Sequence, residues 1–405
     1  MKSNVSKLQA MSVFKGMAFY LPIVSLFFIS QGVALSLIVI SQVFYAIFYL
    51  VGNIPAGVLA DKIGHKQSIV LSGFVAAIAY VLMVIIPGGF GLIVSYSLRG
   101  LSKSFVSGSD ESLMYESVLA SDDGKNNFRR AWGIYSSNDI VGFAASTLIA
   151  GLVLAQYGSN SYVPLILITG FTEVIALGIA LTLKNPSKLS QAIKQKSTAL
   201  VRSSLKLIRT NKTVFTLLLV PILTFSGEYF LYSVYQPYFQ SAGVKPIYIG
   251  LVLTMGAIVN FFALRNSHRL ENFLPLEKIV PSLSIMLAIA YGIMAVFTTP
   301  FLLIASFIAA KGLFNTQSPI ISDYIHENTD SSIRATVTSS IAFIQQFFQI
   351  IARIILGVLV GAIGISGTLK VQALYLLVGA IIAYFVMVAC GCTHRIKHHH
   401  VELPG

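Results

Sequence analysis

The sequence predicts an all-α membrane protein with twelve transmembrane helices arranged as two pseudo-symmetric six-helix bundles. Hydrophobic residues make up 55% of the 405 positions and charged residues only 11%, whereas about a quarter of an ordinary soluble domain is charged. A soluble fold of this size could not remove that much apolar surface from water. Because one span needs about 20 predominantly apolar residues, the chain has room for about twelve spans joined by short loops.

The predicted spans are apolar runs separated by short polar segments. The longest polar break, 184–212, contains eight basic residues and no acidic residue, and its apolar positions recur at near-helical spacing. It is expected to be a basic cytoplasmic linker, with a short amphipathic helix on the membrane surface, between bundles at 1–183 and 213–405. The spans are predicted at 14–31, 35–57, 67–87, 90–117, 131–156, 161–183, 213–239, 247–265, 278–298, 300–324, 335–364 and 369–390.

The distribution of Lys and Arg predicts the orientation. Most of the 28 basic residues lie in the two tails and in the loops on one side, which the positive-inside rule places in the cytoplasm. We therefore expect a multi-pass protein of the inner membrane with both termini cytoplasmic. The net charge of +13 is interpreted as a topology signal and not as a nucleic-acid footprint.

A weak internal repeat indicates duplication of one half. Two Arg-Ala pairs and two pairs of glycines recur at an offset of 204 to 206 residues, close to half the chain. The matching positions are Arg130-Ala131 with Arg334-Ala335, Gly151 with Gly357, and Gly158 with Gly364.

The loop between the second and third predicted spans has the pattern Gly-Val-Leu-Ala-Asp-Lys-Ile-Gly-His-Lys over residues 57–66. Gly57 would allow close helix approach and Gly64 a positive φ. Asp61 can accept hydrogen bonds from a helix N-terminus, and the basic residues can pair with it or face anionic lipid. An ordinary positive-inside loop would explain the basic residues but not the spaced Gly, Asp and Gly.

This segment resembles the loop signature of the major facilitator superfamily, G-x-L-a-D-r-x-G-r-k, in its prokaryotic, drug-efflux-like branch. The resemblance implies two bundles that alternate in access around a central cavity. It also implies that the loop locks the outward-open state, with Asp61 contacting the start of the eleventh helix and Lys62 or Lys66. Glu116, at the cytoplasmic end of the fourth span, is placed to join that cluster.

Two segments depart from the patterns of typical proton-driven drug antiporters of the family. In the fourth span Lys103 stands where the family pattern following Arg99 has Gly, and the fifth span has Val-Gly-Phe-Ala-Ala-Ser at 141–146 in place of G-P-x-x-G-G.

Ionisable residues inside spans are costly and usually face a cavity or a partner. Arg99, Lys103 and Asp110 share one face at 100° per residue, whereas Glu111 points about 100° away from Asp110. Asp110 or Glu111 could carry a proton, and Arg99 or Lys103 could contact substrate or serve as a counter-ion. The alternative is an internal salt-bridge network that only holds helices together.

Other embedded acids have two interpretations each. Asp139 in the fifth span is either a coupling site or a helix-steadying group. Glu228 forms an i, i+4, i+7 stripe with Tyr232 and Tyr235, which suits a cationic or amphipathic ligand or simply packs. Glu173, in the sixth span, is expected to make a structural hydrogen bond.

In the second half, Lys311 lies in the tenth span, and Gln349 and Arg353 lie in the eleventh. The resemblance implies that the first, second, fourth and fifth spans of each half line the cavity, which places Lys311 and Arg353 opposite the fourth-span charges. The resulting charge balance permits a zwitterion, an organic anion or an amphipathic drug-like solute.

The sequence therefore favours a secondary active transporter that exports a small or amphipathic organic compound in exchange for protons. A proton-coupled uptake symporter and a lipid-type flippase are the alternatives. Its expected partners are a small-molecule substrate, protons and the lipid bilayer, and it is expected to act as a monomer.

No cofactor or metal site is expected, and the protein is not expected to be an enzyme. The chain has no G-x-x-x-x-G-K-[ST] loop and no His clearly within a span. Cys390 and Cys392 form no metal-ligand set, and the three histidines at 398–400 are interpreted as a solvated or added tail.

Overall fold

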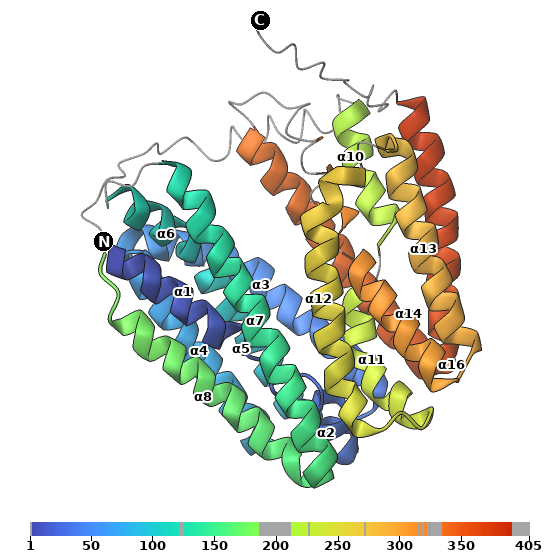
Figure 1. Ribbon diagram of the computed structural model, residues 1–405, viewed down its shortest axis with the longest axis horizontal. Coiled ribbons are helices and arrows are strands. Elements are labelled where there is room, and N and C mark those ends of the chain that lie inside the picture. The colour runs from blue at the N-terminus through green and yellow to red at the C-terminus, as the bar shows by residue number, and fades with distance from the viewer. Residues whose placement is uncertain are drawn as a thin grey trace, which may run out of the picture. The chain divides into compact units, whose positions relative to one another are not determined.

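The structure is a computed structural model that describes residues 2–120, 125–185, 212–225, 227–270, 273–314, 316–317, 320–321, 324 and 334–390. Every regular element in these ranges is a helix (Figure 1). The amphipathic helix predicted within 184–212 lies almost wholly outside the described residues. The helices are α1 (Lys2–Gly16), α2 (Val24–Ser30), α3 (Leu35–Ile63), α4 (His65–Ile85), α5 (Gly88–Val106), α6 (Ser109–Leu119), α7 (Lys125–Tyr157), η1 (Gly158–Ser161), α8 (Tyr162–Leu181), α10 (Lys212–Leu223), α11 (Glu228–Ser241), α12 (Pro246–Leu270), α13 (Leu276–Val296), α14 (Pro300–Leu313) and α16 (Arg334–Ala389).

The chain forms two compact units that do not follow the sequence halves strictly. The first contains Met1–Ile193 together with two segments of the second half, Tyr229–Ile258 and Gln349–Ile365. The second unit contains the remaining segments: Lys194–Glu228, Val259–Phe348 and Ser366–Gly405. The division into bundles at 1–183 and 213–405 stays a prediction.

The helices have the composition of membrane spans. Many large apolar side chains are exposed, among them Phe90 (69%), Phe171 (62%) and Phe385 (64%), which is unfavourable in water but suits a hydrocarbon solvent. Seven helical stretches are long and apolar enough to cross a bilayer: Leu35–Asn53, His65–Ile85, Phe128–Leu181, Phe215–Ser241, Pro246–Ser267, Leu276–Val296 and Ile341–Ala389.

The count of twelve spans stays a prediction, for identifiable reasons. Two of the seven stretches, of 54 and 49 residues, are each longer than one crossing needs. The first, fourth and tenth predicted spans are missing from the set. The first is split between α1 and α2, the fourth carries charged residues in α5, and the tenth is represented by α14, which has only 14 residues.

Close helix packing builds the first unit. In it α3 and α4 pack against α5, α8 packs against α4, and α1 lies beside α7 and α8 (Figure 1). A Cβ added at Gly100 of α5 would lie 2.2 Å from the carbonyl oxygen of Tyr45 in α3, and one at Gly142 of α7 would lie 2.0 Å from that of Val13 in α1. Glycine at these two positions therefore lets the backbones approach.

The second unit is built around an apolar core of its own. Leu217 and Val220 of α10 pack with Val280 and Leu283 of α13 and with Met387 of α16. All five side chains are buried, so this unit has an interior independent of the first.

The first predicted span, 14–31, is interrupted between α1 and α2. Pro22 lacks an N–H group and disfavours helical geometry at Leu21. Inside a bilayer the freed backbone groups need partners, and side chains of other helices supply them. The Ala18 N–H donates to Ser146 Oγ (2.8 Å), the Tyr20 N–H donates to Thr169 Oγ1 (3.0 Å), and the Leu21 carbonyl accepts from the Gln236 amide.

Two further predicted spans, 90–117 and 213–239, are also interrupted. Gly108 (φ 77°) separates α5 from α6, and Gly227 (φ 65°) precedes α11. These positive φ values suit glycine and end the preceding helix. The Phe225 carbonyl accepts from Gln372 Nε2 (2.7 Å), which again satisfies a backbone group at an interruption. The expectation of continuous helices at 14–31, 90–117 and 213–239 was wrong.

The last two predicted spans, 335–364 and 369–390, lie in α16, which consists of two helical segments that meet at a kink. Gly364 (φ 69°, ψ −179°) departs from helical geometry at the kink, the residue where the first of these two spans is predicted to end. The predicted division between the two spans is confirmed at Gly364, although the helix resumes directly after it.

Gly100→Ala should lower the stability of the protein by about 1–3 kcal/mol, the usual cost of overpacking, because its Cβ would meet the Tyr45 carbonyl. Gly178→Ala is the matched control, since a Cβ there meets nothing within 4 Å and alanine favours a helix. The measurement is the apparent melting temperature of each purified variant in detergent. Equal melting temperatures for Gly100→Ala and Gly178→Ala would show that α3 and α5 do not approach in this way.

Candidate functional site

The first unit contains a partly open cavity of about 310 Å³. Helices α1 and α3 to α8 and the interrupted segment between α1 and α2 contribute to its wall. Six of its lining side chains are acidic or basic: Lys15, Arg99, Lys103, Asp110, Asp139 and Glu173. Four of these were predicted site residues, and the cavity brings them together.

Arg99 lies in a cage of tyrosine rings. Its guanidinium carbon lies 4.5 Å from the centroid of Tyr20, 5.1 Å from that of Tyr96 and 5.3 Å from that of Tyr80. It also donates a hydrogen bond to the Tyr20 hydroxyl. The negative faces of the rings stabilise the cation. No carboxylate forms an ion pair with Arg99 in the part of the chain that the structure describes.

Asp110 is held at the start of α6. Its Oδ2 accepts from the Tyr135 hydroxyl (2.8 Å) and its Oδ1 accepts from the Glu111 N–H (2.9 Å), in the helical turn where a negative charge is favoured. Glu111 is exposed and does not line the cavity. Arg99 and Lys103 share one face of α5 as predicted. The extension of that face to Asp110 was wrong, because the break at Gly108 separates α5 from α6.

Lys103 and Asp139 line the cavity and keep part of their side chains exposed. Asp139 lies where α7 meets the end of α1: a Cβ added at Gly16 would lie 2.1 Å from the Asp139 carbonyl oxygen. Because Gly16 has no side chain, the end of α1 can approach the backbone of α7 at this point of the cavity wall.

Two cavity residues were missed as site residues. Lys15 Nζ and Glu173 Oε2 are fully buried and have no hydrogen-bond partner among the described residues. The structural hydrogen bond expected for Glu173 is therefore not observed at Oε2. The sequence does carry a signal for Lys15, since this residue falls inside the predicted span 14–31.

In the second unit, the structure pairs two predicted site residues. Lys311 Nζ of α14 donates to Glu228 Oε1 of α11 at 3.2 Å. The lysine is 4% exposed and the glutamate 22%, so the pair is largely removed from solvent. Glu228 is the first residue of α11, directly after the interruption.

Arg353 of α16 belongs to the first unit but does not line the cavity. Only 2% exposed, it donates through Nη1 to the Gln42 carbonyl of α3 (3.0 Å) and lies 3.9 Å from the centroid of the Tyr229 ring. Its contact with Gln349 Oε1 is longer, 3.5 Å. Arg353 therefore ties α16 to α3, and Gln349 contacts Arg353 within α16. Tyr232 is partly buried on α11.

The loop at 57–66 matches expectation at one of its two glycines. Gly64 has φ 98° and separates α3 from α4, so the positive φ is confirmed. A Cβ at Gly57 would meet nothing within 4 Å in the described structure, and the close helix approach there stays a prediction.

Glu116 contacts this loop through a different residue from the one expected. Its Oε1 lies 3.7 Å from His65 Nε2, an ion pair only when His65 is protonated. Asp61 and Lys62 are exposed and Lys66 is partly buried. The contact of Asp61 with the eleventh helix stays a prediction.

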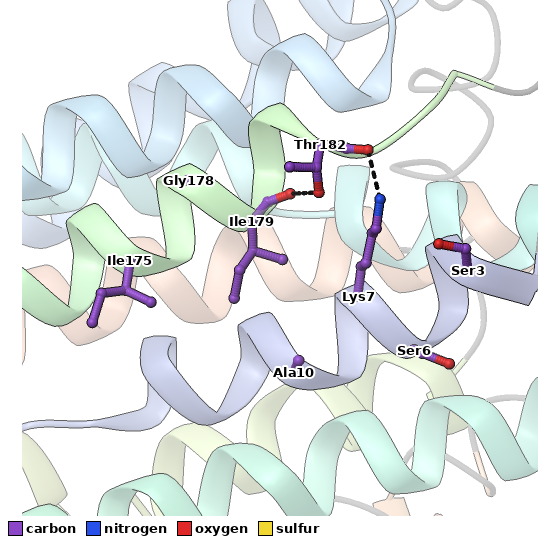
Figure 2. Close-up of a pocket in the computed structure, with 8 residues that line it drawn as sticks. All are labelled: Ser3, Ser6, Lys7, Ala10, Ile175, Gly178, Ile179 and Thr182. Atoms are coloured by element: carbon purple, nitrogen blue, oxygen red, sulfur yellow. Dashed lines mark hydrogen bonds between the residues drawn. The ribbon is translucent and has the colours of Figure 1, made fainter.

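An open groove of about 730 Å³ lies between α1 and α8 (Figure 2). Lys7 Nζ, its one charged group, already donates to the Thr182 carbonyl (3.0 Å). The groove therefore offers a ligand fewer charged groups than the smaller cavity described above. It is lined by Ser3, Ser6, Lys7, Ala10, Ile175, Gly178, Ile179 and Thr182.

Known proteins resemble this chain over nearly its whole length. The MFS-type transporter YxaM of Bacillus subtilis (strain 168) is 23% identical over 381 residues, which cover 90% of this chain and 91% of YxaM. Among solved structures, a point mutant of the nucleoside transporter NupG has a TM-score of 0.77 at 15% identity, over 95% of this chain and 99% of its own.

Two other solved structures share the fold. A bacterial homologue of the human lysosomal transporter Spinster, inward-facing and unoccupied, has a TM-score of 0.75 at 14% identity and covers 96% of this chain and 97% of its own. The peptide transporter POT in complex with sulfate has a TM-score of 0.73 at 12% identity and covers 96% and 95%.

The sequence model of the Major Facilitator Superfamily matches residues 8–352. This range includes the loop at 57–66, the interrupted helices, the charged cavity of the first unit and the pair of Lys311 with Glu228. By this match the chain belongs to the major facilitator superfamily, a family of membrane-spanning transporters and not of enzymes.

Proposed function

We propose that this protein is a proton-coupled secondary active transporter that exports a small or amphipathic organic compound by alternating access. The observation that carries the proposal is the cavity of the first unit, where six ionisable side chains meet. Charges within a bilayer are expensive and are kept where they bind substrates or relay protons.

Two carboxylates are the proposed proton carriers. Asp110 faces the cavity and is hydrogen-bonded to Tyr135, so its protonation changes the charge of the site directly. Glu228 pairs with Lys311, so its protonation removes the partner of a buried cation. Protonation of either carboxylate changes the electrostatic energy of the conformation in which that carboxylate is buried. A proton can thereby favour one conformation of the protein over another.

The interrupted helices support a transport role. Transporters commonly use discontinuous helices, whose unwound backbone lies beside substrate and coupling ions. Here the break between α1 and α2 contributes Met17, Ala18 and Tyr20 to the cavity wall, and the break before α11 ends at Glu228. Both breaks therefore adjoin proposed functional groups.

Two of the similar solved structures are named as a nucleoside transporter and a peptide transporter. This favours a polar organic solute as the substrate of the present protein. Export is favoured by the resemblance of the chain to prokaryotic efflux members of the family. Proton-coupled uptake and lipid flipping are distinguishable outcomes of the first experiment below.

Inverted vesicles from cells that express the protein should lose part of an imposed pH gradient when a transported compound is added. The measurement is recovery of a quenched pH-gradient dye against a panel of organic cations, anions, zwitterions and neutral compounds. Asp110→Asn should abolish the response, because the side chain can no longer exchange a proton, and Glu111→Gln should retain it, because Glu111 lies outside the cavity.

Equal, pH-independent flux in wild type, Asp110→Asn and Glu228→Gln would overturn proton coupling. Accumulation in right-side-out vesicles driven by an inward proton gradient would replace export with uptake. Movement of a fluorescent phospholipid alone would replace it with lipid flipping.

Lys311→Met should destabilise the protein by up to about 3 kcal/mol, because it leaves the Glu228 carboxylate unpaired. The double variant Lys311→Met/Glu228→Gln should recover most of the loss, because no lone charge remains. Melting temperatures of the four proteins in a double-mutant cycle give the coupling, with the exposed Lys245→Met as control. Additive effects of the two substitutions would mean that the pair is not coupled.

Asp61→Asn should slow turnover at least several-fold while leaving expression and melting temperature intact, since Asp61 is exposed in the loop at 57–66 and is expected to act only in one conformation. The initial rate of counterflow, normalised to protein in the membrane, measures it. An unchanged rate would remove the loop from the proposed gate.

A further inference from the structure

The charges of the cavity are sorted by helix. The three cations come from α1 (Lys15) and α5 (Arg99 and Lys103), whereas the three carboxylates come from α6 (Asp110), α7 (Asp139) and α8 (Glu173). The cavity therefore presents three cationic and three acidic side chains, and α1 packs directly against the acid-bearing helices α7 and α8.

These opposite charges do not neutralise each other by direct contact. In the described structure none of the six residues forms an ion pair with another, and the pairs that do form are His65 with Glu116 and Lys311 with Glu228. Equal numbers of opposite charges without ion pairs favour a ligand that is neutral overall and carries both charges. A ligand with a single charge would balance the groups of one sign and leave those of the other sign uncompensated.

Two buried atoms require partners of opposite character. Lys15 Nζ is a donor and Glu173 Oε2 is an acceptor, both buried, both on residues that line the cavity and both without a hydrogen-bond partner among the described residues. A buried charged group without partners is costly. A ligand that offers an acceptor to Lys15 and a donor to Glu173 would relieve both.

Five of the other lining residues are aromatic. Tyr20, Tyr45, Tyr80, Tyr135 and Phe143 line the cavity, and their faces suit stacking with a ring or with an ammonium group. A volume of about 310 Å³ is near the lower limit for ligand sites, so the ligand must be small.

We propose that this cavity binds a small zwitterion with an aromatic group, its carboxylate toward Lys15 and Arg99 and its ammonium group toward Glu173 and Asp139. This inference rests on the proposed transport function, whose substrate class it names. Lys15 and Glu173 are then specificity-determining residues, one for each charge of the ligand.

The test measures equilibrium binding to the full-length protein in detergent by isothermal titration calorimetry. The ligands are L-phenylalanine, L-tyrosine and L-tryptophan, each compared with its amine (phenethylamine, tyramine, tryptamine) and its deaminated acid (phenylpropionate, hydroxyphenylpropionate, indolepropionate). At least one amino acid should bind tenfold or more tightly than both of its relatives.

A second readout follows from the single tryptophan. Trp132 stacks on Tyr135 with ring centroids 4.8 Å apart, and Tyr135 lines the cavity. Its fluorescence should respond to L-phenylalanine, which itself lacks an indole, with the same affinity as calorimetry gives.

The variants separate specificity from general damage. Lys15→Met should weaken amino acid binding about tenfold and leave amine binding unchanged, because only the carboxylate loses its partner. Glu173→Gln should do the converse, weakening the amino acid and sparing the deaminated acid. Lys245→Met, an exposed lysine outside the cavity, should change neither.

The proposal is overturned if none of the amino acids binds, if an amine or acid binds as tightly as its amino acid, or if Lys15→Met and Glu173→Gln weaken all three ligand types alike. No proton gradient enters this test. Binding of zwitterions without proton-driven flux would sink the transport proposal alone, and proton-driven export of other solutes without zwitterion binding would sink this one alone.

Discussion

Backbone groups that leave a helix within a bilayer must be satisfied by the protein itself, because hydrocarbon offers no hydrogen bonds. The segment between α1 and α2 meets this requirement through Ser146, Thr169 and Gln236. These three side chains hold an irregular stretch of chain in place, and that stretch brings Tyr20 to Arg99. The geometry of the cavity thus depends on partners that lie far away in sequence.

The free-energy cost of burying a cation is offset in different ways at Lys311 and at Arg99. Lys311 is stabilised by a direct partner, Glu228, whereas Arg99 is stabilised by aromatic faces and a phenolic oxygen. A direct pair is neutral and closed to other ions. A cation held by rings keeps its charge available, because the rings lower its energy without cancelling it.

The sequence was sufficient to predict the class of fold and much of the chemistry, but it did not predict where helices break. Composition identified a membrane protein, the pattern at 57–66 identified the family, and Gly64 was predicted to take its positive φ. Helical periodicity failed between Lys103 and Asp110, because Gly108 ends α5 and resets the direction of the next helix. An apolar run shows how much hydrocarbon a segment can cross, not whether its backbone is continuous.

Site prediction had the same limit. Arg99, Lys103, Asp110 and Asp139 could be selected because each lies within a predicted span. Lys15 and Glu173 were undervalued, the first for its place near the N-terminus and the second for its place in a span expected to be peripheral. Their roles depend on which side chains remain without partners after packing, a property that only a three-dimensional arrangement defines.

α1 ends at Gly16 and α10 ends at Leu223, 207 residues apart, and Lys103 and Lys311 are 208 residues apart, close to the interval of the internal repeat. If the two halves descend from one ancestor, each inherited a broken first helix and a lysine near the end of its fourth. In the described structure Lys311 pairs with Glu228, whereas Lys103 forms no ion pair. Divergence after duplication would then have left the lysine of the second copy ion-paired and the lysine of the first copy without an ion pair. Selection could alter the ligand specificity of the first copy without disturbing the ion pair of the second.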